Sequence, residues 1–214
     1  MLVGERMTRH PITITEDVGV GEALKIMRDN KVRRLPILDK KGKLVGIVSD
    51  KDLLYASPSP ATSLSVHELH YLLSKLTVKE IMSSPVITVT EYTPLEEAAR
   101  IMADNKIGGL PVMRNDKVVG IITETDMFKI FLEMLGARRK GVRLTMLVPD
   151  VKGMLADITG EIARLGGNII SLGTFYGEDP TSAEIMVKVE GVSQDDLLKA
   201  LEGIAVEILD VRVV

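Results

Sequence analysis

Cysteine is absent from the 214 residues of this chain, and histidine occurs only three times. Without cysteine there is no disulfide framework, no thiolate nucleophile and no cysteine metal site. No nucleophile and base stand at catalytic spacing, and Gly19-Val20-Gly21 is too short for a dinucleotide loop. The sequence therefore predicts that the protein is not an enzyme, with no catalytic residues, no metal and no required cofactor.

An excess of basic charge and long apolar runs are also missing. The 27 Lys and Arg residues and 30 Asp and Glu residues give a net charge of −3, which predicts no nucleic-acid partner. No apolar run is long enough to span a bilayer, and residues 1–6 do not have the pattern of a signal peptide. We therefore expect a cytoplasmic protein with no membrane partner.

The dominant feature that the chain does have is an internal repeat. The offset between the copies is 75 residues at Met7 and Met82, and it falls to 74 at Gly46 and Gly120, so one turn is a residue shorter in the second copy. The repeated pairs are 7–14 with 82–89, 22–31 with 97–106, 35–37 with 110–112, and 46–52 with 120–126.

Each copy predicts the order strand, helix, strand, strand, helix. A unit of about 50 residues buries too little surface to be stable alone, so we expect the two copies to pack together. The proline in the second strand predicts that this strand lies at an edge or an end of its sheet. In the first copy the elements are a β-prone run at 12–14, an amphipathic helix at 20–30, strands at 35–38 and 44–48, and a helix that begins at 52.

The stretch between the copies predicts a loop at 57–63 and a helix at 66–75 that carries His67 and His70. These histidines indicate either a metal site or an exposed helix face. Two histidines three residues apart lack the third ligand that a metal site normally needs. We therefore expect the exposed face.

The chain changes character after residue 135. Residues 136–141 combine glycine with a short basic run and predict a solvated linker. Residues 142–214 then predict the order strand, helix, strand, strand, helix, strand, which is an α+β plait. The predicted fold class of the whole chain is α+β.

The duplicated stretch contains the candidate functional side chains, because Ser49 and Asp52 recur as Thr123 and Asp126. One interpretation is a helix cap, in which the hydroxyl accepts from the backbone three residues on and the carboxylate reaches back. The other is a ligand site: an aspartate can accept from two sugar hydroxyls, whereas hydroxyl and N–H groups at a helix start suit phosphate. The two interpretations are compatible, and spacing alone leaves both open.

Each copy resembles a CBS domain, and the tandem pair resembles a Bateman module over about residues 1–135. The resemblance rests on three landmarks that occur twice in order: Pro-Ile-Thr-Ile or Val-Ile-Thr-Val, Leu-Pro-Ile or Leu-Pro-Val, and Gly-x-x-Ser/Thr-x-x-Asp. Such modules are regulatory and bind adenosine nucleotides or S-adenosylmethionine in clefts between the copies. The resemblance therefore implies AMP, ADP, ATP or S-adenosylmethionine as a regulatory ligand.

The resemblance also implies roles for individual residues at two nucleotide sites. Asp52 and Asp126 would hold ribose hydroxyls, and Ser49 and Thr123 would face phosphate. The base would be lined by Ile12, Thr13 and Ile14 and by Ile87, Thr88 and Val89, and Pro36 and Pro111 complete the expected set.

The copies differ where phosphate charge would be met, because Arg33 and Arg34 stand where the second copy has Gly108 and Gly109. Guanidinium groups pair well with phosphate. We assign the arginines to the cleft of Asp126 and expect two unequal nucleotide sites. The alternative is that both arginines are simply solvated at an edge.

The third unit, residues 142–214, resembles an ACT domain with the ferredoxin-like order βαββαβ. The resemblance rests on residues 149–155 (PDVKGML) and 166–169 (GGNI). ACT domains pair through their sheets and bind amino acids at the shared interface, which implies Asp150, Gly153 and Asn168 as amino-acid contacts. A dimerisation domain without a ligand is the alternative. Two CBS copies followed by an ACT domain resemble the CBS–ACT acetoin-utilisation proteins.

The predicted organisation is a first CBS domain at 1–56, a linker with a helix at 57–78, a second CBS domain at 79–135, a linker at 136–141 and an ACT domain at 142–214. We expect a non-catalytic regulatory sensor that forms a homodimer through CBS and ACT faces. Because the chain contains no output domain, the regulated protein is a separate, unknown partner. The alternative is a dimerising scaffold or accessory subunit of a metabolic enzyme with no small-molecule ligand.

Overall fold

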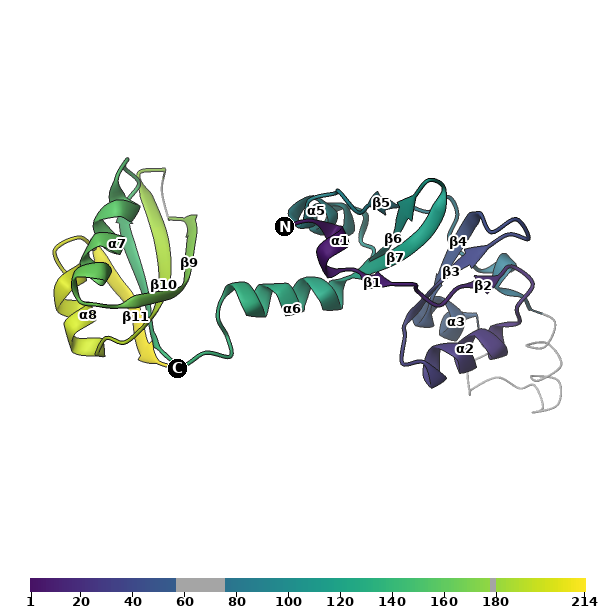
Figure 1. Ribbon diagram of the computed structural model, residues 1–214, viewed down its shortest axis with the longest axis horizontal. Helices are drawn as coiled ribbons and strands as arrows, with labels where there is room; N and C mark the ends of the chain where they lie inside the picture. Colours follow the sequence, from purple (N-terminus) through teal and green to yellow (C-terminus); the bar gives the residue numbers. More distant parts are fainter. Residues whose placement is uncertain (57–75, 178–179) are drawn as a thin grey trace. The chain divides into compact units, whose positions relative to one another are not determined.

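The computed structural model describes residues 1–56, 76–177 and 180–214. These residues form two compact units, Met1–Met127 and Phe128–Val214 (Figure 1). The predicted loop at 57–63 and the predicted helix at 66–75, with His67 and His70, lie outside the described residues. Both units combine helices with a sheet, which confirms the predicted α+β class. Among the described residues no helix combines the length and apolar character needed to cross a membrane.

The first repeat packs two helices against a three-stranded sheet of order β2-β3-β4. Its core is formed by apolar side chains of α2 and the sheet, with Ala23 and Leu35 fully buried and Met27 nearly so. The apolar spacing in α2 places these residues on one face, which explains why this segment forms a helix against the sheet. The elements are β2 (Ile14–Thr15), α2 (Val20–Asp29), β3 (Arg34–Leu38), β4 (Leu44–Ser49) and α3 (Asp50–Tyr55).

The second repeat has the same order after a short 3₁₀ turn, and its sheet gains a fourth strand. The strand order is β1-β7-β6-β5, in which β1 comes from the start of the chain. The elements are α1 (Val3–Arg6) and β1 (Thr8–Arg9), then η1 (Val78–Glu80), β5 (Val89–Thr90), α5 (Leu95–Asn105), β6 (Gly109–Arg114), β7 (Lys117–Thr123) and α6 (Glu124–Met134).

Three details differ from the sequence prediction. The β-prone run at 12–14 forms a strand only from Ile14, and α3 begins at Asp50 rather than at Asp52. The strand that contains Pro36 is central rather than at an edge, because β3 pairs with both β2 and β4. Proline is tolerated there because β2 pairs only with the two strand residues that follow Pro36.

The two repeats exchange their leading segments. Strand β1 pairs with β7 of the second repeat through Thr8 and Ile121, and in the reverse direction Ser83 forms a bridge with Ile47 of β4. A Cβ at Gly120 would overlap the Met7 side chain, and one at Gly46 would overlap Met82. Glycine in the Gly-x-x-Ser/Thr-x-x-Asp stretch therefore suits the close approach of a methionine from the leading segment of the other repeat.

The second unit is a four-stranded antiparallel sheet of order β11-β8-β10-β9 with two helices. Its element order confirms the predicted plait. Alternate residues of β8, from Val142 to Val148, enter a core with Ile158, Ile162 and Leu197. The elements are β8 (Val142–Pro149), α7 (Met154–Arg164), β9 (Asn168–Tyr176), β10 (Ser182–Glu190), α8 (Gln194–Leu201) and β11 (Glu207–Val213).

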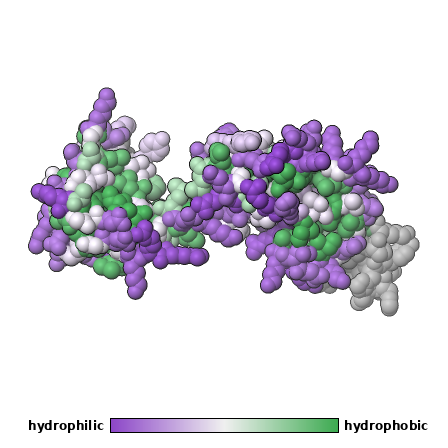
Figure 2. All heavy atoms as spheres, in the orientation of Figure 1, coloured by the Kyte–Doolittle hydropathy of each residue, from purple (hydrophilic) through white to green (hydrophobic). Residues whose placement is uncertain are grey.

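The segment that follows α6 is tied to this sheet. Gly136 is buried, and its carbonyl accepts a hydrogen bond of 3.0 Å from the amine of Lys188, which is itself 4% exposed. Gly141 exchanges two backbone hydrogen bonds of 2.9 Å with Val214. The predicted linker is thus held at both ends by the second unit. Apolar side chains, among them Phe128 and Met134, are exposed along α6 (Figure 2).

Candidate functional site

The first unit contains a cavity of about 560 Å³ to which both repeats contribute. The first repeat supplies the β4–α3 junction with Ser49 and Asp52, and the second supplies Ile87 and the turn between α5 and β6. The cavity is therefore large enough for a nucleoside-sized ligand. Its lining residues are Arg33, Arg34, Ile47, Ser49, Asp50, Lys51, Asp52, Tyr55, Ser83, Pro85, Val86, Ile87, Lys106, Ile107, Gly108, Gly109 and Glu124.

The β4–α3 junction forms a capping box. The Ser49 hydroxyl and backbone N–H donate to Asp52 Oδ2 at 2.7 and 2.8 Å, and the Asp52 N–H lies 3.3 Å from Ser49 Oγ. Across the part of the chain that the structure describes, Oδ1 of Asp52 accepts no hydrogen bond. The cap therefore leaves one carboxylate oxygen, at the edge of the cavity, available to a ligand.

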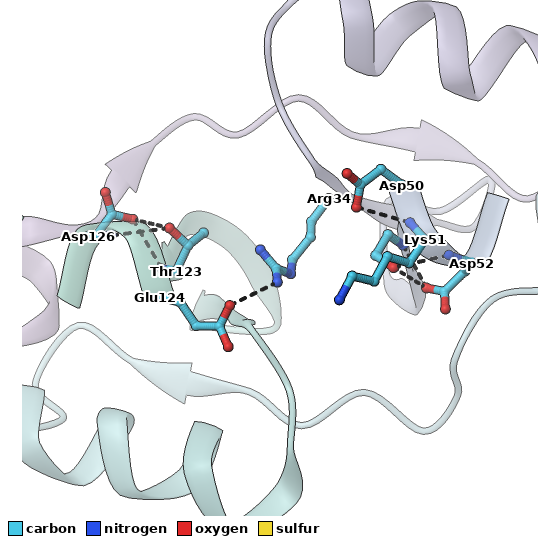
Figure 3. A network of polar contacts seen from close by, with 8 residues as sticks. Arg34, Asp50, Lys51, Asp52, Thr123, Glu124 and Asp126 are labelled. Atoms are coloured by element: carbon cyan, nitrogen blue, oxygen red, sulfur yellow. Dashed lines mark hydrogen bonds and ion pairs between the residues drawn. The ribbon is translucent and has the colours of Figure 1, made fainter. Parts of the chain in front are cut away.

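The β7–α6 junction repeats this geometry in the second copy. Thr123 donates to Asp126 Oδ2 from its hydroxyl at 2.7 Å and from its backbone N–H at 3.0 Å. The helix-cap interpretation thus holds at both junctions, and Figure 3 shows the two caps on either side of Arg34. Thr123 and Asp126 do not line the cavity that contains Asp52.

The exchange of leading segments carries Ile87 to the cap of the first repeat. Ser83 and Ile47 are joined by two backbone hydrogen bonds of 2.9 and 3.2 Å, and both residues line the cavity. Ile87 follows four residues later and is 40% exposed. The corresponding pairing joins Thr8 to Ile121 of β7, and Ile12 packs against the core of the first repeat. Of the two predicted base-lining runs, the cavity contains Ile87.

The cavity carries more positive than negative side chains. Its cations are Arg33, Arg34, Lys51 and Lys106, and its carboxylates are Asp50, Asp52 and Glu124. The cations lie in a cavity that also contains the start of α3, where backbone N–H groups are oriented outward. This balance favours a ligand with negative charge.

Arg34 lies against the backbone of the glycine pair in the second repeat. A Cβ at Gly108 would overlap the Arg34 guanidinium, and a Cβ at Gly109 would come within 3.0 Å of Arg34 Cδ. Arg34 Nη2 lies 3.5 Å from Glu124 Oε2 (Figure 3). Arg34 fits beside Gly108 and Gly109 because these two residues have no side chains. The arginine pair of the first copy and the glycine pair of the second are therefore sterically complementary.

The structure brings together only part of the predicted nucleotide set. The cavity contains Arg33 and Arg34, which sequence reasoning assigned to the cleft of Asp126, together with the cap that contains Asp52. The predicted residues that do not line this cavity are Ile12, Thr13, Ile14, Pro36, Thr88, Val89, Pro111, Thr123 and Asp126.

Four charged residues in the cavity, Asp50, Lys51, Lys106 and Glu124, were missed by sequence reasoning. Lys51 lies inside the duplicated stretch, and Glu124 is the first residue of α6. Lys106 has φ of 54°, in the left-handed region that usually favours glycine, and Lys31 has the same conformation at the equivalent position. The sequence does show that lysine occurs at this position in both copies, and this repetition could have identified Lys106 as a candidate site residue.

The predicted amino-acid contacts of the second unit do not come together within one chain. Asp150 follows Pro149, which pairs with Ser182 at one end of β10, whereas Asn168 pairs with Glu190 at the other end. Eight residues of strand separate these ends by ~26 Å. Gly153, with φ of 95°, caps α7 near the Asp150 end.

Asn168 is also occupied by a contact within the chain. Its amide donates to Glu190 Oε1 at 2.7 Å, and Arg139 donates to the same oxygen at 2.6 Å. These hydrogen bonds, the one from Asn168 first, lower the pKa of the Glu190 carboxyl. Within the described residues, no group of three or more His, Asp or Glu side chains is arranged to hold a metal ion.

Comparison with known families agrees with these two units. The CBS domain family model matches residues 3–59 and 78–133, and the ACT domain family model matches residues 142–205. A CBS domain-containing protein of Dictyostelium discoideum is 32% identical over 136 residues, which are 63% of this chain and 94% of that protein. The L-aspartate semialdehyde sulfurtransferase of Methanocaldococcus jannaschii is 34% identical over 131 residues, which are 61% of this chain but only 23% of that enzyme.

The solved structures that resemble the chain match a part of it that is about as long as the CBS pair. A CBS domain pair in complex with 5′-methylthioadenosine and S-adenosyl-L-methionine is 32% identical, with a TM-score of 0.53, and the match covers 65% of this chain and 98% of that one. AcuB, an acetoin utilization protein of Vibrio cholerae, is 35% identical with a TM-score of 0.52, over 64% of this chain and 95% of that one. CBSX2 in complex with AMP is 31% identical with a TM-score of 0.51, over 64% of this chain and 98% of that one.

Proposed function

We propose that this chain is a regulatory protein whose CBS pair senses an adenosine ligand. The chain belongs to the CBS-domain family and continues into an ACT domain, and the proposal starts from this membership. AMP, ADP, ATP and S-adenosylmethionine are the candidate ligands, and the protein acts on a partner without catalysis. Related CBS pairs solved with AMP or with S-adenosyl-L-methionine and 5′-methylthioadenosine support this proposal.

The observation that carries the proposal is the cavity at the cap of the first repeat. One carboxylate oxygen of Asp52 is left over by the cap and suits a ribose hydroxyl. Ile87 offers an apolar surface to a base, and the arginines and lysines offer positive charge to a phosphate. The three parts of a nucleotide therefore each have a complementary group, and AMP is the ligand that this set favours.

Calorimetric titration of AMP into the full chain and two matched variants tests the proposal. Because a hydrogen bond to a charged group contributes about 1.5–3 kcal/mol, Asp52→Asn is expected to weaken AMP binding about tenfold or more. Asp126→Asn makes the same change at the equivalent cap but outside the cavity, so it should leave this affinity unchanged. Equal effects of both variants would contradict the assignment of the site.

A dimerising scaffold without a small-molecule ligand is the second candidate function. It is favoured by the helix caps, which account for Ser49 and Asp52 without any ligand, and by exposed apolar side chains on α3 and α6, such as Tyr55 at 88% and Phe128 at 69%. A ligand that binds only the folded state raises the melting temperature. If no adenosine compound raises it, the scaffold is the better description.

We further infer that the protein forms a homodimer and that its ACT unit binds an amino acid, if it binds one, only between two copies. The ~26 Å between the ends of β10 separates Asp150 from Asn168 in one chain, so a shared site would need a second chain. Light scattering with and without amino acids would detect such an assembly. The regulated partner is a separate protein, which a pull-down with and without AMP would identify.

A further inference from the structure

Arg34 is held where the two repeats meet, and its position is set by the second repeat. Its side chain is 22% exposed and lies along the backbone of Gly108 and Gly109, close enough that a methyl group at Gly108 would overlap the guanidinium. The same methyl group would come within 2.5 Å of Glu124 Oε2. One small space beside Gly108 is therefore shared by a guanidinium and a carboxylate.

Glu124 is the acidic side chain paired with this guanidinium. Its Oε2 lies 3.5 Å from Arg34 Nη2, while its backbone N–H donates to the Gly108 carbonyl at 3.0 Å and fixes the start of α6. Its side chain is 58% exposed, so it can leave Arg34 for solvent at little cost. The equivalent residue in the first repeat, Asp50, instead accepts a hydrogen bond from the backbone of Lys51.

The cavity beside Arg34 is where the proposed nucleotide phosphate would meet positive charge. A phosphate forms shorter and stronger hydrogen bonds to a guanidinium than a carboxylate at 3.5 Å does. A carboxylate beside a phosphate is also electrostatically unfavourable. Glu124 and a phosphate therefore cannot both use Arg34 favourably.

We propose that Glu124 is an internal competitor for Arg34, which an incoming phosphate has to displace. This inference rests on the proposed function, and it makes Glu124 a specificity-determining residue. Its carboxylate weakens the binding of phosphorylated ligands and leaves unphosphorylated ones unaffected. The Arg34–Glu124 pair thus sets how strongly the cavity distinguishes a nucleotide from a nucleoside.

The test is calorimetric titration of AMP and of adenosine into the full chain and Glu124→Gln. An exposed ion pair of this kind contributes little, so AMP should bind about two- to fivefold more tightly to Glu124→Gln, with no change for adenosine. Glu96→Gln is the matched control, because Glu96 is exposed on α5 and outside the cavity. The control should change neither affinity.

Two further variants show whether the effect passes through Arg34. In Arg34→Gln, AMP binding should weaken, and adding Glu124→Gln should then give a smaller gain than in the wild type, because only the repulsion between carboxylate and phosphate is left to remove. This comparison is a double-mutant cycle. Gly108→Ala should likewise lower the preference for AMP over adenosine, because the added methyl displaces the guanidinium. Gly21→Ala, where a Cβ meets no atom within 4 Å, is its control.

The outcomes separate this inference from the proposed function. If AMP binds the wild-type chain and Glu124→Gln leaves its affinity unchanged, the competition is overturned and the sensor remains. An equal gain for AMP and adenosine, or a gain of the same size in the absence of Arg34, also overturns it. If neither AMP nor adenosine binds the wild-type chain, the proposed nucleotide site is wrong and the competition falls with it.

Discussion

At the scale of single residues, a buried polar atom without a hydrogen-bond partner lowers the free energy of unfolding. Thr145 in β8 is 5% exposed and faces away from the core formed by its neighbours Leu144 and Met146. Its hydroxyl is buried and has no hydrogen-bond partner within the described part of the chain. Burying a hydroxyl without a partner is unfavourable, so this side chain reduces the stability of the second unit.

Replacement of this hydroxyl by a methyl group should stabilise the protein. We expect Thr145→Val to raise the free energy of unfolding by up to ~1 kcal/mol, because it removes an unpaired buried polar atom and retains a β-branched side chain in the strand. Urea denaturation would measure the change. Thr145→Ser, which retains the hydroxyl and loses the methyl group, should have the opposite sign. A less stable valine variant would indicate that the hydroxyl has a partner such as a buried water.

At the scale of elements, the C-terminal end of α6 is fixed by side chains of the ACT sheet. Lys188 of β10 donates to the Gly136 carbonyl at 3.0 Å, and Ser171 of β9 donates to the Leu135 carbonyl at 3.1 Å. Carbonyl groups at a helix end lack partners within the helix and attract positive charge. The basic and glycine-rich composition of residues 136–141 predicted a solvated linker because it contains no sign of this long-range contact.

Removal of the lysine amine should therefore weaken this attachment. We expect Lys188→Met to lower the free energy of unfolding of the C-terminal unit by about 1–3 kcal/mol, because the buried Gly136 carbonyl is left without its donor. Hydrogen exchange of the amides in residues 135–141 should increase at the same time. Lys199→Met, at an exposed position of α8, is the matched control. Equal effects of the two substitutions would show that only charge is being measured.

At the scale of the whole molecule, the start of the chain joins the two CBS repeats. The N–H groups of Val3 and Gly4 donate to the carbonyls of Thr93 and Glu91 at 2.9 Å each. The Glu91 side chain, 10% exposed, accepts from Arg114 at 2.5 Å and lies 3.6 Å from Arg9. The segment 1–9 therefore belongs structurally to the second repeat, although it precedes the first in sequence.

This cluster predicts an acid-dependent contribution to stability. The hydrogen bond from Arg114, followed by the charges of Arg114 and Arg9, holds the pKa of the Glu91 carboxyl below its usual value. The stabilisation is thus complete above the unfolded pKa of about 4.3 and is lost as the pH falls through the lower folded value.

We expect Glu91→Gln to be less stable than the wild type at pH 7. The difference in stability should shrink as the pH falls through the folded pKa of the Glu91 carboxyl. Thermal unfolding from pH 7 to pH 3 would measure the difference. Glu97→Gln removes an exposed ion pair within α5 and should have little effect at any pH. A Glu91→Gln difference that stays constant with pH would contradict the linkage.

The sequence by itself determined the features that depend on neighbouring residues. The apolar spacing of α2 and α5, the Ser49–Asp52 and Thr123–Asp126 caps and the βαββαβ order are local. The helices and the caps occur once in each CBS copy. The CBS and ACT resemblances rested on the same local motifs and are confirmed by the family comparisons.

Only the tertiary structure decided which residues meet. The contact of Arg34 with Gly108 and Glu124 joins segments more than 70 positions apart, and no periodicity encodes it. The exchange of leading segments places Ile87 at the cap of Asp52, and no periodicity encodes this contact either. Contacts between the repeats depend on how the folded surfaces of both repeats pack together. The separation of Asp150 from Asn168 likewise follows from strand register, which sets distances that spacing along the chain does not.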